Sequence, residues 1–416
     1  MRLDFSVLGY WNYFFFMLMA LIIAAIAYTI SHIVDALDRR TRFSGVVVAG
    51  TIVALVSSLP EFTSSLVSLF SNSKIGPSEA ACNLMGGNLF RTIMFAAVLI
   101  CFITQIKKLK TTKTIVISVV TQIIIFALYI VFTIGWWSFS DNNDSFLYTS
   151  KFKDIIFGSF AGIVILAYAF NIWYMYQKSK RDKPTKIKEK KDDYIKGKWL
   201  QAKFYSYFNK CNVTTMLLIF LLCSISIILC AIFLGVTSNS LIQSWGWGGE
   251  EAGNQAGFGT SLLLGISTSI PEIVMVITLL RLKNINTAFS DIFGSNMFSI
   301  LILAILTFLN MGNQQNIFGE DNSLELGILS IWGFLAISFL GLLILVNFIY
   351  VKKNLAYKNG YYTFQIIFLS LCVCCYIVYI VTSFTNTNEK IFDWLSGNRI
   401  GINHNKYLLM MNVLLQ

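Results

Sequence analysis

The sequence predicts an all-α polytopic membrane protein with about ten transmembrane helices, arranged as two inverted five-helix repeats. Two observations underlie this prediction. Hydrophobic residues make up 56% of the 416 residues and charged residues only 13%, a balance that a soluble domain does not reach without exposing large apolar patches. In addition, a short polar motif occurs once in each half of the chain. The composition therefore places the chain in a lipid bilayer, and the duplication divides it into two related halves.

Apolar runs define the predicted helices, because about 20 apolar residues cross the hydrocarbon core of a bilayer. The runs lie at residues 12–33, 43–70, 80–104, 114–137, 155–176, 214–236, 257–280, 287–309, 324–350 and 361–382. Proline and small polar residues interrupt the second and the seventh run. The first run is too long for the apolar core of a signal peptide and has no small-residue cleavage site, so we expect it to stay in the mature protein.

The net charge of +11 comes from Lys and Arg residues that gather in alternate loops. Basic residues follow the first, third, fifth, seventh and ninth runs, whereas the other connections hold few cations. Under the positive-inside rule this alternation predicts a multi-pass protein of the cell membrane with both termini outside. The basic loops then face anionic lipid headgroups. The expected partner is therefore the lipid bilayer and not nucleic acid, and nothing in the sequence indicates an oligomeric state.

A charged segment at residues 177–212 divides five predicted spans from five and is interpreted as a basic, solvated cytoplasmic linker. The first half covers residues 1–176 and the second half residues 213–384. A tail at residues 385–416 ends in an apolar run that is too short to span a membrane, and we expect it on the outer surface. Eight cysteines lie mostly in the apolar runs without a CxxC pair, which predicts packing residues and not a disulfide framework.

The duplicated motif has two parts. Residues 56–62 read V-S-S-L-P-E-F and residues 267–273 read S-T-S-I-P-E-I; the second part is G-G-N-L-F at residues 86–90 and G-S-N-M-F at residues 294–298. Because each half has an odd number of predicted spans, the second copy enters the membrane in the opposite orientation. Proteins built from inverted repeats bind their ligands near the bilayer midplane, at interrupted helices. The motif is therefore the predicted ligand site.

The residue types of the first motif indicate a cation site. A glutamate inside a span is costly unless it is protonated, paired or bound to a cation, which makes Glu61 and Glu272 functional candidates. The helix-breaking residues Pro60 and Pro271 cannot donate to the carbonyl four residues earlier, so backbone oxygens become available beside the hydroxyls that precede them. These hydroxyls, on the same helical face as the glutamates, belong to Ser57, Ser58, Thr268 and Ser269. An all-oxygen set favours hard cations such as Ca²⁺ or Na⁺, and no cofactor is expected.

The helix after each motif has a polar face with a four-residue period. This face consists of Asn83, Gly87 and Arg91 in the first half and of Asp291, Ser295 and Ser299 in the second. A structural alternative stays open for each single residue, because Ser and Thr often bond to their own helix, proline often only kinks it, and small residues let helices pack closely.

These residues resemble the sodium/calcium exchanger group of the cation/Ca²⁺ antiporter superfamily, whose two α-repeats carry G-T-S-x-P-E and then G-S-N-x-F-N/D. The likeness covers residues 44–95 and 258–302, and the ten-span layout agrees over most of the chain. It implies a secondary active antiporter, not an enzyme, that exchanges Ca²⁺ for Na⁺ or H⁺ by alternating access. It also implies that Glu61 and Glu272 bind both cations, with ligands completed by Ser57, Ser58, Thr268, Ser269 and Ser295. Gly87 stands where the family has the serine of the second motif.

The last position of the second motif departs from the family, because it is Arg91 in the first repeat and Ser299 in the second. Arg91 lies deep in its span and does not lose its proton, so we expect it to pair with Glu61 or Glu272. Arg91 then substitutes for one bound cation, which predicts fewer Na⁺ per Ca²⁺, H⁺ as the counter-ion, or no exchange. Asp291 is a further candidate metal ligand, provided that its side chain points inward. The residues expected to modulate the site are Arg91, Asn83, Asn88, Asn296 and Ser299.

Two alternative functions stay open on the sequence. Oxygen ligands alone do not distinguish Ca²⁺ from Na⁺, K⁺ or Mg²⁺, so another cation is a possible substrate. A non-transporting membrane scaffold or sensor, locked by Arg91, belongs to a different class of protein, and ion flux distinguishes it from a carrier. An intramembrane enzyme is least expected, because the sequence shows no nucleophile and base pair and no HExxH motif.

Overall fold

The computed structural model describes residues 11–40, 45–70, 76–102, 113–140, 150–179, 199–244, 259–310, 323–352 and 360–384. Helix is the only regular secondary structure in these ranges, which confirms the all-α class. Seven described helices are long and apolar enough to cross a membrane, two bent helix pairs raise the number to nine, and Ile115–Val131 is a shorter apolar helix. The exact count of ten is thus not confirmed in the described ranges. The tail at residues 385–416 lies outside them.

The two halves repeat one order of elements: a long helix, a broken helix and three more long helices. The first half contains α1 (Trp11–Arg40), α2 (Gly45–Val48), η2 (Ala49–Val53), α3 (Ala54–Ser57), α4 (Leu59–Leu69), α5 (Gly76–Cys101), α7 (Lys113–Ser140) and α8 (Ser150–Ser179). The second half contains α11 (Val213–Ser244), η5 (Thr260–Leu264), α13 (Gly265–Thr268), α14 (Ile270–Arg281), α15 (Ile285–Leu309), α16 (Ser323–Lys352) and α17 (Gly360–Phe384). Each broken helix includes one π-helical turn, η2 or η5.

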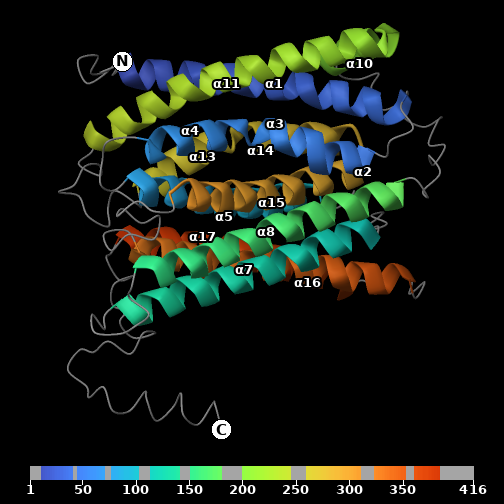
Figure 1. Cartoon of the computed structure of the whole chain (residues 1–416). Helices are drawn as coiled ribbons and strands as arrows, with labels where there is room; N and C mark the ends of the chain where they lie inside the picture. The colour runs from blue at the N-terminus through green and yellow to red at the C-terminus, as the bar shows by residue number, and fades with distance from the viewer. Residues whose placement is uncertain are drawn as a thin grey trace.

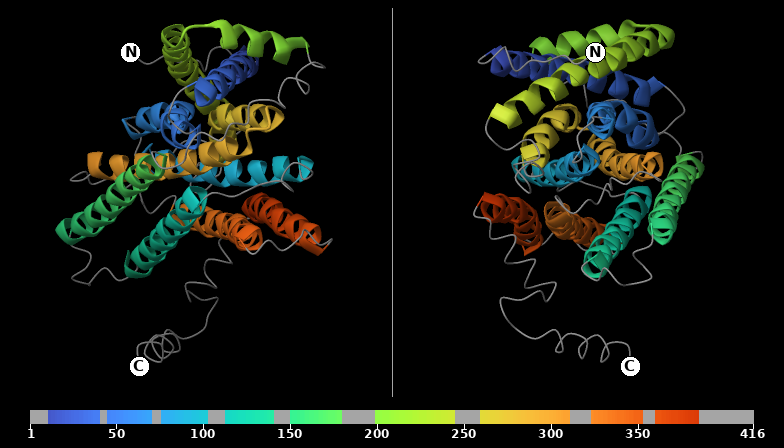
Figure 2. Two further views of the ribbon diagram at one scale, coloured as in Figure 1. Left: turned by 90° about the vertical axis from the view of Figure 1, so that its right-hand side faces the viewer. Right: turned by 60° about the vertical axis from the view of Figure 1, so that its left-hand side comes forward.

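The helices pack in layers (Figure 1). α1 and α11 lie side by side on one face, the broken helices lie next to them, α5 and α15 occupy the middle, and α7, α8, α16 and α17 cover the opposite face. Two further views show the same order (Figure 2). Contacts cross between the halves, because α1 packs on α14, α11 on α4, α5 on η5 and α15 on η2. The repeats therefore interlock around the broken helices and do not form two separate bundles.

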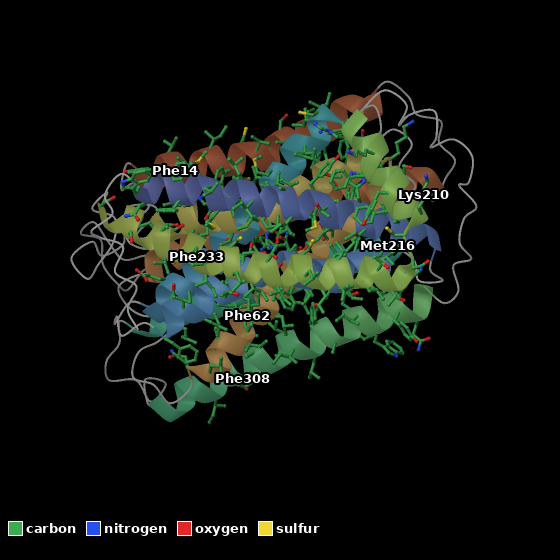
Figure 3. The ribbon with its side chains drawn as sticks, turned by 90° about the horizontal axis from the view of Figure 1, so that it is seen from above. Phe14, Phe62, Lys210, Met216, Phe233 and Phe308 are labelled. Atoms are coloured by element: carbon green, nitrogen blue, oxygen red, sulfur yellow. The ribbon has the colours of Figure 1, made fainter. Side chains whose placement is uncertain are left out.

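Burial separates the central helices from the lipid-facing ones. Most of the spans of α5 and α15 is buried inside the protein, whereas little of α1 and α11 is. Phe14 on α1 and Phe233 on α11 are exposed and lie toward one end of this helix pair, with Lys210 and Met216 toward the other (Figure 3). Since lipid is as apolar as these side chains, their exposure is the expected state in a bilayer.

Both broken spans bend at the serine that lies two residues before the proline of the Pro-Glu pair. The helices on either side of Ser58 are bent by 46°, and those on either side of Ser269 by 43°. The proline that follows occupies the first turn of α4 or α14, where a missing N–H costs little because the first helical N–H groups have no intrahelical partner. The glutamate after it also lies in this first turn, at the positive end of the helix dipole.

Glycines let α5 and α15 cross the broken helices at backbone distance. A Cβ atom on Gly294 would lie 2.5 Å from the carbonyl oxygen of Gly50, and one on Gly86 would lie 2.5 Å from that of Ser261. This close approach confirms the packing role that the sequence offered for Gly86 and Gly294.

The last third of the predicted linker is helical. Helix α10 (Trp199–Lys210) lies there and packs on α1, where the ring of Phe204 stacks on His32 with centroids 5.5 Å apart and Phe208 is buried. The apolar face of this helix is short and surrounded by lysines, so composition concealed it. The middle of the linker, residues 180–198, lies outside the described residues.

Candidate cation site

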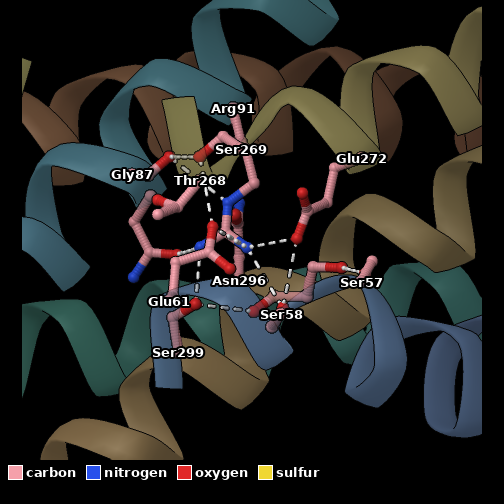
Figure 4. A network of polar contacts seen from close by, with 12 residues as sticks. Ser57, Ser58, Glu61, Gly87, Arg91, Thr268, Ser269, Glu272, Asn296 and Ser299 are labelled. Atoms are coloured by element: carbon pink, nitrogen blue, oxygen red, sulfur yellow. Dashed lines mark hydrogen bonds and ion pairs between the residues drawn. The ribbon is translucent and has the colours of Figure 1, made fainter. Parts of the chain in front are cut away.

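The two motif glutamates come together at the centre of the protein. Glu61 and Glu272 are fully buried. The hydroxyl of Ser58 donates a hydrogen bond to Glu272 Oε1 (3.3 Å), and the hydroxyl of Ser269 donates one to Glu61 Oε1 (3.2 Å) (Figure 4). Each repeat thus bonds to the carboxylate of the other repeat. This reciprocal arrangement follows from the inverted symmetry and places both carboxylates in one polar cluster.

Arg91 of α5 reaches both carboxylates. Its Nη1 atom lies 3.2 Å from Glu272 Oε1 and 3.6 Å from Glu61 Oε1, and it donates to the hydroxyl of Ser58 at 3.3 Å. The ion pair predicted with one of the two glutamates is therefore formed with both. The guanidinium group occupies the space between them (Figure 4).

The other nitrogen atoms of Arg91 also have partners. Nε donates to the carbonyl oxygen of Gly87 at 3.3 Å, and Nη2 donates to Asn88 Oδ1 at 2.9 Å and to the hydroxyl of Ser299. A buried charge is stable only when it is paired and its donors are satisfied. Arg91 meets both conditions, so its positive charge is a fixed component of the site.

Acceptor oxygens remain that receive no hydrogen bond from the described residues. They are Glu61 Oε2, Glu272 Oε2 and both carboxylate oxygens of Asp291, all of them buried. A buried polar atom without a partner costs free energy. Oxygens of this kind are also the ligands that Ca²⁺ and Na⁺ prefer. The cluster therefore has acceptors for a cation and lacks donors for them.

Asp291 lies one helical turn before Ser295 on α15. No group of three or more His, Cys, Asp or Glu residues in the described ranges is placed to hold a metal ion together. Asp291 is thus not a third carboxylate around a common ion with Glu61 and Glu272 in this conformation.

The remaining hydroxyl candidates divide into two groups. The hydroxyls of Ser57 and Ser295 are 3.0 Å apart and link α3 to α15 across the repeats. The hydroxyl of Thr268 instead donates to the carbonyl oxygen of Leu264 on its own helix at 2.9 Å. Bonding to the residue's own helix is therefore the state of Thr268 in this conformation. Ser57 and Ser269 have both kinds of contact, because their hydroxyls also lie 3.1 Å from the carbonyl oxygen of Ala54 and 2.8 Å from that of Gly265.

The asparagines extend the polar network along α5 and α15. Asn296 donates to the hydroxyl of Thr92 at 3.0 Å, and Asn83 donates to the hydroxyls of Ser64 and Ser65 on α4 at 2.9 and 3.0 Å. Thr92 was not predicted from the sequence, although it lies four residues after Asn88 and hence on the same helical face. Asn83 supports α4 and makes none of the contacts that join the two glutamates.

Comparisons with known proteins show the family and the fold of the chain. The sequence model of the family described as "Sodium/calcium exchanger protein" matches residues 11–176 and 215–385. By structure, the chain is similar to the H⁺/Ca²⁺ exchanger CAX, with a TM-score of 0.56 and 14% identity over 91% of this chain and 92% of that chain. It is also similar to the sodium-calcium exchanger NCX_Mj soaked with 2.5 mM Na⁺ and 10 mM Sr²⁺, with a TM-score of 0.54 and 15% identity over 91% of this chain and 99% of that chain. A search among curated protein sequences found no match.

Proposed function

Because the chain belongs to the sodium/calcium exchanger protein family, we propose that it is a secondary active antiporter that exchanges Ca²⁺ for Na⁺ or H⁺ across the cell membrane. The observation that supports this proposal most is the reciprocal bonding of each motif serine to the glutamate of the other repeat. The similar structures are an H⁺/Ca²⁺ exchanger and a sodium-calcium exchanger, so both counter-ions are retained.

The proposed mechanism is competition for shared carboxylates. Ca²⁺ and the counter-ion each bind at Glu61 and Glu272 and neutralise them. The carrier closes around its site only in the neutralised state, because a net charge buried in a membrane is costly. The hydroxyls of Ser58 and Ser269 then turn from the carboxylates so that their oxygens face the cation. Opening alternates because α1 and α11, which face lipid, pack on the broken helices that hold the site.

The proposed ligand set keeps the residues expected from the sequence, with Glu61 and Glu272 at its centre and Arg91 as a fixed charge between them. The oxygen ligands proposed around the glutamates are those of Ser57, Ser58, Thr268, Ser269, Ser295 and Asp291. For the orientation we propose that both termini are outside and that the linker at residues 177–212 is cytoplasmic, since the basic loops alternate.

A second candidate function rests on Arg91. All three guanidinium nitrogen atoms have hydrogen-bond partners, and one of them joins both glutamates. A guanidinium group held in this way supports a non-transporting membrane scaffold or sensor, in which Arg91 permanently occupies the place of a cation.

Transport by purified protein in proteoliposomes separates the two functions. We expect ⁴⁵Ca²⁺ uptake under an imposed outward Na⁺ gradient or under a pH gradient, and we expect Glu272→Gln to abolish it. Glu79→Gln, at the start of α5 and outside the site, is the matched control and retains uptake. Absence of uptake under either gradient, with a protein that elutes as a monodisperse species, would overturn Ca²⁺ antiport and support the second function. Uptake that persists in Glu272→Gln would overturn the proposed site.

A further inference from the structure

Two positions on the polar faces of α5 and α15 differ in charge between the repeats, and the two differences have opposite signs. Arg91 adds a positive charge in the first repeat, at the position of Ser299 in the second. Asp291 adds a negative charge in the second repeat, and its counterpart in the first is Asn83, since both lie four residues before the small residue of their motif, Ser295 or Gly87. The inverted symmetry is thus broken twice, and the two changes offset each other.

Formal charges around the site sum to −2. The fully buried charged side chains there are Glu61, Glu272 and Asp291 against Arg91. The other buried carboxylate in the described ranges, Asp35, accepts a hydrogen bond from Asn284 in the turn between α14 and α15, at the end of the spans. The site therefore has the charge of two glutamates alone, although it contains four ionic groups.

We propose that this core holds one divalent cation or two monovalent cations in turn, so that each exchange cycle moves no net charge across the membrane. This inference rests on the proposed antiport function. Either load brings the core from −2 to zero, and the cost of burying net charge is then avoided equally in both half-cycles. Arg91 takes part as a tethered cation, because it stays protonated and its nitrogen atoms are held by the protein.

The position of Asp291 on α15 supports counting its negative charge in the charge of the core. Asp291, Ser295 and Ser299 follow each other at four-residue spacing on α15, and Ser299 accepts a hydrogen bond from Arg91. Both carboxylate oxygens of Asp291 are buried without a hydrogen-bond partner among the described residues. Its charge acts on the site from the neighbouring turn and does not require direct contact with the ion that Glu61 and Glu272 bind, because electrostatic interactions are strong in a dry interior.

The test is the Ca²⁺ ratio at flux balance, measured in proteoliposomes whose membrane potential is clamped with K⁺ and valinomycin. With two monovalent ions per Ca²⁺, a tenfold gradient of the driving ion gives a hundredfold Ca²⁺ gradient at every potential. If each cycle moved one charge, the ratio would change about 50-fold per 100 mV. We expect no change in the wild-type protein. A shift of that size, with gradient-driven uptake intact, would overturn this inference and leave the antiport function standing.

Charge variants test the origin of the balance. Asp291→Asn leaves a core of −1, which a single monovalent cation neutralises. We therefore expect one counter-ion per Ca²⁺, so that each cycle moves one charge and an inside-negative potential raises internal Ca²⁺ by up to about 50-fold per 100 mV. Arg91→Gln leaves −3, which three monovalent cations neutralise, so each cycle should move one charge in the opposite direction and shift the ratio the other way. The double variant returns to −2 and should again be independent of potential. Single variants that remain independent of potential would overturn the charge argument. Absence of uptake in the wild-type protein would overturn the antiport function and this inference with it.

Discussion

At the scale of single residues, Arg91 determines the state of the site. Its guanidinium group lies in a buried cluster, joins Glu61 to Glu272 and donates from every nitrogen atom. Two carboxylates in one dry site repel each other unless a positive charge lies between them. Arg91 supplies that charge in the absence of a bound ion, so the empty carrier retains a paired and hydrogen-bonded core.

Arg91→Met should therefore destabilise the protein. Removing one partner of a buried ion pair costs about 3–5 kcal/mol, since the remaining charges lose their partner. Thermal unfolding in detergent measures this loss, and saturating Ca²⁺ should restore part of it by binding the folded state. Arg281→Met, at an exposed position near the end of α14, is the matched control. Equal loss of stability in both variants would contradict a special role for Arg91.

Ser295 should contribute an oxygen that its mirror position lacks. Its hydroxyl lies 3.0 Å from that of Ser57, whereas Gly87 occupies the equivalent position of the first repeat. We expect Ser295→Ala to weaken Ca²⁺ binding by a factor of roughly five, the value of one hydrogen-bonding group of about 1 kcal/mol. Ser226→Ala is the control, because that exposed hydroxyl bonds only to its own helix at Leu222. Unchanged affinity in Ser295→Ala would remove this residue from the ligand set.

The sequence predicted which residues form the site but not which of them bond to each other. The burial depth of Arg91 was enough to predict an ion pair, because an unpaired guanidinium has no place in a span. The bonds of Ser58 to Glu272 and of Ser269 to Glu61 were not predictable, since they depend on how the two repeats interlock. The hydroxyl of Thr268 bonds to a backbone carbonyl of its own helix. The sequence had left open whether it does so or faces the site.

At the scale of elements, close crossings hold the broken helices in position. Gly294 meets the backbone of Gly50 on η2, where an added Cβ atom would lie 2.5 Å from a carbonyl oxygen. Backbone atoms cannot move aside as a flexible side chain does. Any side chain at position 294 would therefore strain the crossing of α15 over η2. The same argument applies to Gly86, where α5 crosses the backbone of Ser261 on η5.

Gly294→Ala should accordingly lower the stability by about 1–3 kcal/mol, the usual cost of overpacking a tight interior. Gly162→Ala on α8 is the control, because nothing lies within 4 Å of its Cβ position and alanine is the better helix former. Unfolding temperatures of the two variants should move in opposite directions or, for Gly162→Ala, not at all. A neutral Gly294→Ala would contradict the close crossing.

The positions of the long helices were predictable from the sequence, because the length of an apolar run determines where a membrane-spanning helix lies. The long helices match the predicted runs closely, whereas the π-helical turns η2 and η5 were not predicted from the sequence. The Pro-Glu pairs predicted the two breaks, and the bends at Ser58 and Ser269 confirm them. Helix α10 was missed because its apolar face is only a few residues long and its contact with α1 is tertiary.

At the scale of the whole molecule, the orientation of the protein in the membrane can be tested by protease cleavage. A protease site inserted into the linker, between residues 183 and 190, should be cut in inside-out membrane vesicles and protected in right-side-out vesicles, because the basic loops are expected on the cytoplasmic side. The same site placed after residue 385 should show the reverse pattern. Cleavage of the linker in right-side-out vesicles would invert the proposed topology.

Glu61 and Glu272, joined across the two repeats, are proposed to bind the cation that the protein exchanges. Equilibrium binding of ⁴⁵Ca²⁺ to the purified protein, with competition by Na⁺ and by protons, measures this binding. We predict saturable binding that either competitor displaces, and that Glu61→Gln and Glu272→Gln each abolish while Glu79→Gln does not. Binding that survives both substitutions would place the cation elsewhere and contradict the account.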